Sequence, residues 1–349
     1  MRAKIEAWLN RQWYGSKSPA MLLRALVPLY QGLRWLDLLL ARRKASANGL
    51  ALPPIIVVGN LTVGGSGKTP LVIWLVEQAL AAGFKPGVIS RGYGGSYRNR
   101  HTALVVGRAA DWRECGDEPL LIANRTGVPV AVCRNRINAA HVLRHECDLL
   151  ICDDGLQNTH LLRTVEILVI DGTRRFGNAR LLPAGPLREA LPRDLAARYP
   201  LRVCTTAEDA PKPRSDSSGE YGMRLLGGVA VNTKTQERRA LAAFADAPVY
   251  ALAGIGNPER FYQSLRHQGI TIEPVPIGDH GLLSDAQWQV LTENSSSRRT
   301  LLMTEKDAIK YPESANAWAV PVSAEISAEL WQKCAAVIKK SKRDAKCSN

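Results

Sequence analysis

The sequence lacks any cysteine pattern that would support a disulfide framework or a zinc site. Its seven cysteines are scattered, their number is odd, and no two of them stand as Cys-x-x-Cys. Such usage favours reduced thiols in a cytosolic protein. A secretory signal is also missing, because the first apolar run begins late and no small-residue cleavage site follows it. We therefore expect a protein that stays inside the cell.

Long uncharged apolar runs are missing too. The apolar segment at residues 19–45 is interrupted by Arg24, Arg34 and Asp37, which makes it a poor transmembrane span. Acidic residues are few, with 32 Asp and Glu against 46 Lys and Arg, a net charge of +14. This excess favours an anionic partner, but it is concentrated in residues 1–46 and in the tail KKSKRDAK. Because no nucleic-acid recognition module accompanies it, nucleic acid is not an expected partner.

Apolar sequence is plentiful enough for a large core. The chain has 349 residues, of which 46% are hydrophobic, and this suits two compact domains or one large domain with additions. Near residues 205–222 the composition becomes polar and rich in Pro and Ser, which is typical of a linker. We predict four parts: an amino-terminal arm at 1–46, a core at 47–204, a linker with a strand pair at 205–245, and a carboxy-terminal α/β domain at 246–349.

The arm is basic and amphipathic. Residues 1–46 hold nine Lys or Arg and two acidic residues, a net charge of +7. Pro28 is expected to kink the helix or restart it. Such a helix suits an anionic membrane surface, and a helix packed on the protein's own core fits the same pattern. The leucines that form one helical stripe, at spacings of three or four, are Leu22, Leu26, Leu29, Leu33, Leu36 and Leu40.

The stretch VVGNLTVGGSGKTP, residues 57–70, has the context of a phosphate loop. It follows a β-branched apolar run and precedes a helical pattern that stops at Gly83. Lys68 would reach the β- and γ-phosphates of a nucleotide, and Thr69 would bind magnesium. Thr62 stands where the usual pattern has its first glycine, which is tolerated if the backbone there is open to any residue. The residues expected to line the nucleotide are Thr62, Gly64, Gly65, Ser66, Gly67, Lys68 and Thr69.

An acid at the end of a second strand usually completes such a site. Asp153 and Asp154 directly follow the apolar segment Leu149–Ile151, and either or both would hold the magnesium. An exposed Asp-Gly turn is the alternative. Asp117 opens a helix in GDEP, where helix capping is the alternative to chemistry.

The order of the segments predicts an α/β fold. Strand and helix patterns alternate from residue 55 to 204, which indicates a phosphate-loop NTPase-like parallel sheet with helices on both faces. MRLLGGVAVNT, residues 223–233, reads as two paired strands around a glycine turn. A second alternation begins at Pro248 and predicts the smaller α/β domain, with a capping box from Ser284 to Gln287 and an N-cap at Thr304. The segment at 176–189 lacks apolar periodicity and is expected to be an ordered loop over the site.

Taken together, the motifs resemble one family over nearly the whole chain: tetraacyldisaccharide 4'-kinase, the lipid A kinase of Gram-negative bacteria. The motifs that carry the resemblance are, in order, GNLTVGGSGKTP, SRGYGG, GDEP, DDGLQ, FGNARLLPAGPLRE, AGIGNPERF, GDH and TEKDAIKY. The family accepts Ser or Thr at the position of Thr62. It begins with a hydrophobic, basic helix that associates with the inner membrane, which favours the membrane reading of the arm.

The resemblance implies a reaction and its residues. The γ-phosphate of ATP passes, with Mg²⁺, to the 4'-hydroxyl of a disaccharide that carries four acyl chains and a 1-phosphate. Asp117 acts as the base, aided by His280, and Lys68 gathers charge on the transferred group. Glu189 is implied as a further metal-linked acid. Tyr93 and Arg188 are implied to contact substrate or phosphate.

The same resemblance implies a monomer bound peripherally to the cytoplasmic face of the inner membrane. One departure stands out, because Asn158 replaces the histidine that usually follows DDG-[LF]-Q, and its role is changed or passed to His160. A different class of function is a phosphate-loop switch or assembly ATPase, which would hydrolyse ATP without phosphorylating a sugar.

Overall fold

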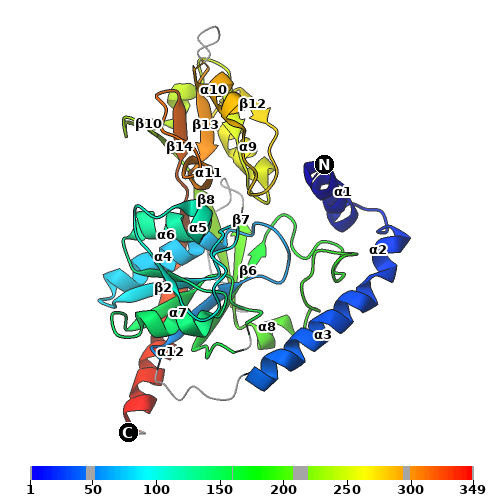
Figure 1. The fold of residues 1–349 in the computed structure, drawn as a ribbon, viewed down its shortest axis with the longest axis vertical. Helices are drawn as coiled ribbons and strands as arrows, with labels where there is room; N and C mark the ends of the chain where they lie inside the picture. Colours follow the sequence, from blue (N-terminus) through cyan, green and yellow to red (C-terminus); the bar gives the residue numbers. More distant parts are fainter. Residues whose placement is uncertain (1, 45–51, 159, 207–218, 294–298, 348–349) are drawn as a thin grey trace. The chain divides into compact units, whose positions relative to one another are not determined.

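A computed structural model describes residues 2–44, 52–158, 160–206, 219–293 and 299–347. The described residues form two compact units (Figure 1). The larger unit takes its residues from Ala7–Arg224 and Ala324–Asn349, and the smaller from Met1–Glu6 and Leu225–Ser323. Each unit is built on its own sheet, so the fold is α/β throughout, as the sequence predicted.

The larger unit is built on a mostly parallel sheet that has nine strands within the described residues. All the strand pairs from β4 across to β8 run parallel, and β3 joins β4 antiparallel at one edge. The central β1 lies between β5 and β6, so the loops after these strands meet at one edge of the sheet. In spatial order the strands are β15 (Ser323–Ile326), β8 (Glu220–Leu226), β7 (Leu201–Thr206), β6 (Val165–Asp171), β1 (Ile55–Gly59), β5 (Leu149–Cys152), β2 (Pro86–Ser90), β4 (Val130–Val132) and β3 (Leu104–Val106).

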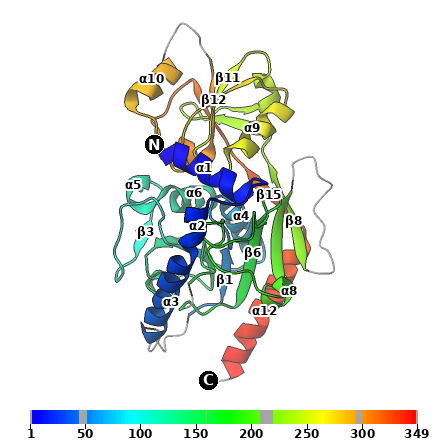
Figure 2. The ribbon, with the colours of Figure 1, turned by 90° about the vertical axis from the view of Figure 1, so that its right-hand side faces the viewer.

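Helices flank this sheet (Figure 2). Alternate residues of β1 face opposite sides, and Ile55 and Val57 pack with Leu143 of α7 in a single buried cluster. All five residues of β1 are buried, as expected of a central parallel strand. The helices of this unit are α2 (Met21–Ala25), α3 (Val27–Lys44), α4 (Lys68–Ala81), α5 (Trp112–Cys115), α6 (Asp117–Thr126), α7 (Arg136–Leu143), α8 (Leu195–Arg198) and α12 (Ala328–Cys347). The first helix, α1 (Arg2–Tyr14), belongs to it only from Ala7 onward.

The arm folds as helices that leave much of their apolar surface uncovered. α2 ends at Ala25 and α3 begins at Val27, with Pro28 in its first turn, so the predicted restart at Pro28 is confirmed. The predicted stripe is exposed from Leu22 to Leu36, with exposed fractions of 72% for Leu22 and 61% for Leu29, and the Leu40 side chain lies outside the described part. Among the described residues, none of the helices combines the length and apolar character needed to cross a bilayer.

The smaller unit has a separate sheet and core. β11, β12, β13 and β14 run parallel, and β9 and β10 add antiparallel strands at one edge. The predicted capping box is confirmed, because Ser284 N donates to Gln287 Oε1 at 3.0 Å and Gln287 N donates to Ser284 Oγ at 3.3 Å. Thr304 also caps its helix as predicted. In spatial order the strands are β10 (Arg238–Ala240), β9 (Val229–Asn232), β14 (Ala317–Val320), β13 (Leu301–Thr304), β11 (Val249–Leu252) and β12 (Ile272–Val275); the helices are η1 (Leu241–Phe244), α9 (Pro258–His267), α10 (Asp285–Glu293) and α11 (Glu305–Ala308).

Two features differ from the sequence-based expectation. The predicted pairing of the strands around Gly227 and Gly228 is wrong, because β8 joins the larger sheet beside β7 and β9 joins the smaller sheet beside β14. The glycine pair therefore carries the chain from one sheet to the other. In addition, α12 belongs to the larger unit although its residues lie in the segment predicted as the carboxy-terminal domain. There Trp331 meets Phe84 edge-on, with ring centroids 6.0 Å apart.

The cysteines agree with the expectation of reduced thiols. Six of them are free and buried within the described residues. Burial raises the pKa of the Cys115, Cys147 and Cys152 thiols to about 11, which keeps them protonated and unreactive near neutral pH.

Candidate active site

The phosphate loop joins β1 to α4, as the sequence predicted. Gly67 is the residue before the helix and has a left-handed backbone, with φ of 87°, and Gly64 has φ of 107°. Side chains are disfavoured in this conformation, so glycine is needed here for its backbone freedom. The helix begins at Lys68, so Thr69 lies in its first turn, where free backbone N–H groups favour an anion.

The loop also pairs with the segment before Arg188. Val63 N donates to Pro186 O at 2.9 Å, and Arg188 N donates to Leu61 O at 2.7 Å. Between them, Thr62 forms an antiparallel bridge with Leu187, in extended geometry that any residue adopts. This explains why threonine fits where the usual motif has glycine. It also shows that the segment at 176–189 lies against the phosphate loop.

Asp153 and Asp154, which follow β5, have different surroundings. Asp153 is 1% exposed, and its Oδ1 has no hydrogen-bond partner. Burial, together with the charges of Glu118 and Asp154, raises the pKa of the Asp153 carboxyl to about 7. Burial alone would also raise the pKa of Asp154, but Lys68 and Arg188 more than offset it and hold that pKa below its usual range. Asp154 is thus paired with cations, and Asp153 has an oxygen without a hydrogen-bond partner.

Lys68 is held between an amide and a carboxylate. Its Nζ donates to Asn60 Oδ1 at 3.2 Å and lies 3.6 Å from Asp154 Oδ1. Gln157 Nε2 donates to Asn60 O at 3.0 Å, which ties the loop after β5 to the loop after β1. Asn60 and Gln157 were not predicted as site residues. Their only signal in the sequence is that they lie within GNLTVGGSGKTP and DDGLQ.

Arginines surround Asp154 from several elements. Arg188 Nη1 lies 3.1 Å from Oδ1 and 3.0 Å from Oδ2 of Asp154. Arg136, which opens α7, donates to the Asp154 backbone oxygen at 2.8 Å. Burial and the charges of Arg136 and Arg134 lower the pKa of Arg91, which follows β2. Of these arginines only Arg188 was predicted, and the cluster makes the edge of the sheet favourable for an anion.

Glu189 lies beside this cluster, and both of its carboxylate oxygens accept hydrogen bonds. Gln157 Nε2 donates to Oε1 at 2.8 Å, and Arg34 Nη2 donates to Oε2 at 3.0 Å. The residue predicted as a metal-linked acid therefore joins α3 to the loop after β5. Its partner Gln157 also contacts Asn60 and Arg188, which in turn contact Lys68 and Asp154.

Asp117 is buried at the first turn of α6, with an exposed fraction of 3%. Its Oδ1 accepts a hydrogen bond from Glu118 N at 2.9 Å, whereas the N-cap position of α6 is Gly116, which offers no side-chain cap. Gly116 precedes it with φ of 94°, and a side chain there would meet Tyr93 O at 2.7 Å. GDEP therefore packs directly against SRGYGG. The Tyr93 side chain itself is 58% exposed.

His280 belongs to the smaller unit, in the loop after β12. Its backbone has φ of 54°, and its N donates to Gly254 O at 3.0 Å. Lys306 Nζ lies 3.3 Å from His280 Nε2, and Asp279 Oδ1 lies 3.8 Å from the same nitrogen. The GDH, AGIGN and TEKD motifs therefore meet around this ring, at the carboxyl ends of β12, β11 and β13.

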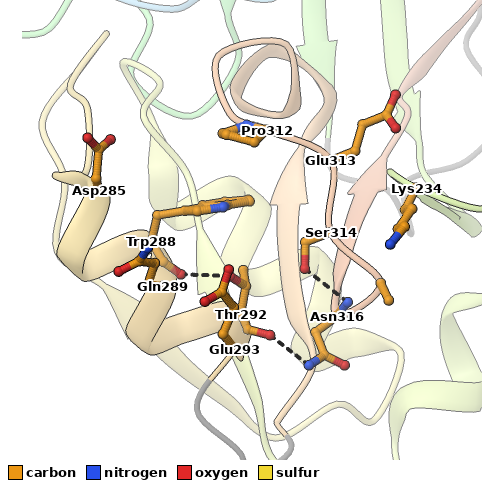
Figure 3. Close-up of a pocket in the computed structure, with 11 residues that line it drawn as sticks. Lys234, Asp285, Trp288, Gln289, Thr292, Glu293, Pro312, Glu313, Ser314 and Asn316 are labelled. Carbon is orange, nitrogen blue, oxygen red and sulfur yellow. Dashed lines mark hydrogen bonds between the residues drawn. The ribbon is translucent and has the colours of Figure 1, made fainter.

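The smaller unit also has a pocket of about 540 Å³ away from these motifs (Figure 3). Trp288, Thr292 and Asn316 line it, and Asn316 Nδ2 donates to Thr292 O at 2.8 Å. No residue predicted for the active site lines this pocket. It therefore carries no part of the predicted chemistry.

Asn158, which stands where the family pattern has histidine, shapes its own turn. Its side-chain oxygen accepts a hydrogen bond from His160 N at 3.2 Å, and its backbone oxygen accepts one from Arg163. The contact with His160 N is thus the one that depends on the amide side chain.

Magnesium would find oxygen ligands at the phosphate loop but no ready-made cage. Within the described residues, no three His, Cys, Asp or Glu side chains gather as a metal cluster. The unpartnered Asp153 Oδ1 and the Thr69 hydroxyl are ligands of the type Mg²⁺ prefers, and this ion usually takes its remaining ligands from phosphates and water. The residues present therefore fit magnesium that arrives with a nucleotide.

Known proteins resemble the chain over most of its length. A family model described as tetraacyldisaccharide-1-P 4'-kinase matches residues 19–339. A tetraacyldisaccharide 4'-kinase of Methylobacillus flagellatus is 41% identical over 95% of this chain and 96% of its own length. One from Aeromonas hydrophila is 42% identical over 92% and 93%. A crystal structure of LpxK from Aquifex aeolicus in complex with ATP is similar, with a TM-score of 0.70, 27% identity, and coverage of 92% of this chain and 99% of that one.

Proposed function

Because the chain belongs to the tetraacyldisaccharide-1-P 4'-kinase family, we propose that it transfers the γ-phosphate of ATP to the 4'-hydroxyl of a tetraacyldisaccharide 1-phosphate in lipid A biosynthesis. The observation that carries this assignment is the phosphate loop whose Lys68 lies 3.6 Å from Asp154, in the loop after the neighbouring strand β5. A lysine and an acid so placed are what phosphoryl transfer from a nucleotide requires. No finding favours a switch or assembly ATPase.

The phosphate loop binds the triphosphate of ATP. Backbone N–H groups from Gly64 to Thr69 turn toward it, and the start of α4 adds positive potential. Lys68 then exchanges its contact with Asp154 for the phosphates and stabilises charge on the transferred group. The crystallised relative from Aquifex aeolicus is a complex with ATP, which supports this role.

Thr69 with Asp153, Asp154 or both would hold Mg²⁺. When bound, the ion neutralises phosphate charge and orients the γ-phosphate for in-line attack. The unused Oδ1 of Asp153 supports this assignment, because an unpaired buried oxygen is costly unless a cation completes it. Glu189 is assigned to the same metal by resemblance, and its bonds to Arg34 and Gln157 hold its carboxylate in place beside the loop after β5.

Asp117 is assigned as the base that takes the proton of the 4'-hydroxyl, aided by His280. A sugar hydroxyl is a poor nucleophile, and a positioned carboxylate can accept its proton as the new bond forms. The burial of Asp117 supports this role, because exclusion of water strengthens the interaction of a carboxylate with a bound hydroxyl. Tyr93 and Arg188 are assigned to contact the substrate or its phosphates.

The arm places the kinase on its lipid substrate. The exposed leucines of α2 and α3 suit the acyl boundary of an anionic membrane, and the basic residues of the arm suit its headgroups. The proposal therefore includes a monomer held peripherally on the cytoplasmic face of the bacterial inner membrane.

The function is tested by mass spectrometry of the reaction product. A tetraacylated disaccharide 1-phosphate is incubated with ATP, Mg²⁺ and the protein, and the expected product is heavier by one phosphate group. Lys68→Ala serves as the control, because it keeps the fold of the loop while removing the cation that contacts the phosphates. ATP hydrolysis without phosphorylated lipid would reject the kinase in favour of a switch ATPase.

A further inference from the structure

Two polar side chains of α3 bind the segment beside the phosphate loop. Tyr30 Oη donates to Arg188 O at 2.7 Å, and Arg34 Nη1 donates to the same oxygen at 2.6 Å. Arg34 Nη2 also donates to Glu189 Oε2 at 3.0 Å. The planar guanidinium of Arg34 thus holds a backbone carbonyl and a side-chain carboxylate of consecutive residues through two nitrogens of a rigid fork, a geometry that the single nitrogen of lysine does not reproduce.

From Glu189 the contacts continue without a break to the phosphate loop. Glu189 Oε1 accepts from Gln157 Nε2 at 2.8 Å, and Gln157 Oε1 accepts from Arg188 Nη1 at 3.3 Å. Arg188 in turn binds both oxygens of Asp154, which lies 3.6 Å from Lys68. A series of hydrogen bonds and ion pairs therefore joins the arm to the lysine that contacts the nucleotide.

The same helix leaves its apolar residues exposed. Leu29 and Leu33, which flank Tyr30 and Arg34 in sequence, are 61% and 60% exposed. Polar contacts therefore fix this part of α3 to the segment at Arg188 and Glu189. An ordinary surface helix would pack through its apolar face instead. A helix that served only as an anchor would need no such contacts to residues at the active site.

We propose that Tyr30 and Arg34 are positioning residues for phosphoryl transfer, which set Arg188 and Glu189 in place and so connect the arm to the phosphate loop. This inference rests on the proposed kinase function. Without Arg34, Glu189 keeps the hydrogen bond from Gln157 as its one side-chain contact within the described residues, and competes with Asp154 for the neighbouring Arg188 guanidinium. Asp154 is then left to bind Lys68, which becomes less available to the phosphates.

The test uses the full chain with ATP and the lipid substrate dispersed in detergent micelles, so that membrane binding does not limit the reaction. Arg34→Ala is expected to lower kcat about tenfold while vesicle sedimentation stays near that of the unmodified protein. Tyr30→Phe removes one of two donors to Arg188 O and should cause a smaller loss. Arg34→Lys keeps a cation and should recover part of the activity, and both milder variants serve if Arg34→Ala does not fold. Gln31→Ala, on the exposed side of the same helix, is the matched control and should change nothing.

A double-mutant cycle separates positioning from general destabilisation. Gln157 contacts Glu189 and Arg188 but has no bond to Arg34, so a link through those residues makes the effects of Arg34→Ala and Gln157→Ala on kcat non-additive. Additive effects, or a loss by Arg34→Ala seen with vesicles and absent in micelles, would overturn the inference and leave the arm as an anchor alone. If the unmodified protein phosphorylates no lipid, the proposed function fails instead, and the two failures are told apart.

Discussion

Arg188 binds both carboxylate oxygens of Asp154 through one nitrogen, at 3.1 and 3.0 Å. Lys68 approaches one of the same oxygens at 3.6 Å, so the Asp154 carboxylate is shared by Lys68 of the phosphate loop and by Arg188. The sharing limits how strongly Asp154 holds Lys68. Because the side chain of Asp154 is partly enclosed, neither cation is fully screened by water.

Substitution Arg188→Ala is expected to impair the use of ATP. The Asp154 carboxylate then loses its closest ion pair, keeps Lys68 at 3.6 Å, and competes with the phosphates for it. A hydrogen bond to a charged group contributes about 1.5–3 kcal/mol, so kcat/KM for ATP should fall roughly ten- to a hundredfold. Arg193→Ala, at an exposed position of the same segment, is the control. Equal loss in both variants would show that charge alone, and not this contact, matters.

The sequence was sufficient to identify the parts of the site that lie in continuous motifs. Lys68 and Thr69 follow from the strand–glycine–helix context, and Asp153 and Asp154 follow from the end of a buried strand. Since β1 and β5 are neighbours in a parallel sheet, their following loops had to meet. Asn60 could not be found in this way. The side chain that binds its backbone oxygen, Gln157, is 97 residues distant, and an amide residue leaves no local sequence pattern.

The sequence-based predictions that were wrong or incomplete depend on contacts between residues far apart in the chain. A pair of glycines between two short apolar runs reads the same whether the chain forms a hairpin or passes to a second sheet. The pairing of β9 with β14, far along the chain, decides against the hairpin. The surroundings of Glu189 likewise depend on Arg34, 155 residues earlier, which no spacing rule connects to it.

Asp117→Asn separates the role of base from the hydrogen bond that Asp117 makes at the start of α6. Asparagine keeps a side-chain oxygen that can accept from Glu118 N, so the first turn of α6 should keep this hydrogen bond while the proton acceptor is lost. Turnover is expected to fall by about 10²–10⁴, with ATP affinity measured by calorimetry unchanged. The matched control is Asp111→Asn, because Asp111 caps α5 through Arg113 N and has no assigned chemistry. Full activity of Asp117→Asn would leave Asp117 with a structural role only.

The buried pair of Asp307 and Lys310 is expected to stabilise the smaller unit. Their side chains are 0% and 1% exposed, and Lys310 Nζ lies 3.0 Å from Asp307 Oδ1. Asp307 Oδ2 also accepts from Gly254 N at 2.8 Å, which holds the loop that contacts His280. Asp307→Ala leaves a buried cation without its carboxylate and should lower the free energy of unfolding by about 3–5 kcal/mol.

Hydrogen exchange of peptides from residues 246–311 measures this change in the smaller unit. Glu259→Ala is the control, because the exposed Glu259–Arg266 pair should contribute less than about 1 kcal/mol. Similar exchange in both variants would contradict a stabilising role for the buried pair.

The exposed leucines of α3 allow membrane binding to be tested without deleting the arm. Leu29→Glu and Leu33→Glu each place a charge where the apolar face would enter the lipid, whereas Gln31→Glu adds the same charge at an exposed polar position of the same helix. Burying a leucine contributes about 1.5–3 kcal/mol, so each leucine variant should bind anionic vesicles more than tenfold more weakly. Gln31→Glu should show only the small electrostatic loss. Equal sedimentation of all three variants with the unmodified protein would mean that this face does not enter lipid, and the basic residues of the arm would then have to serve another anionic partner.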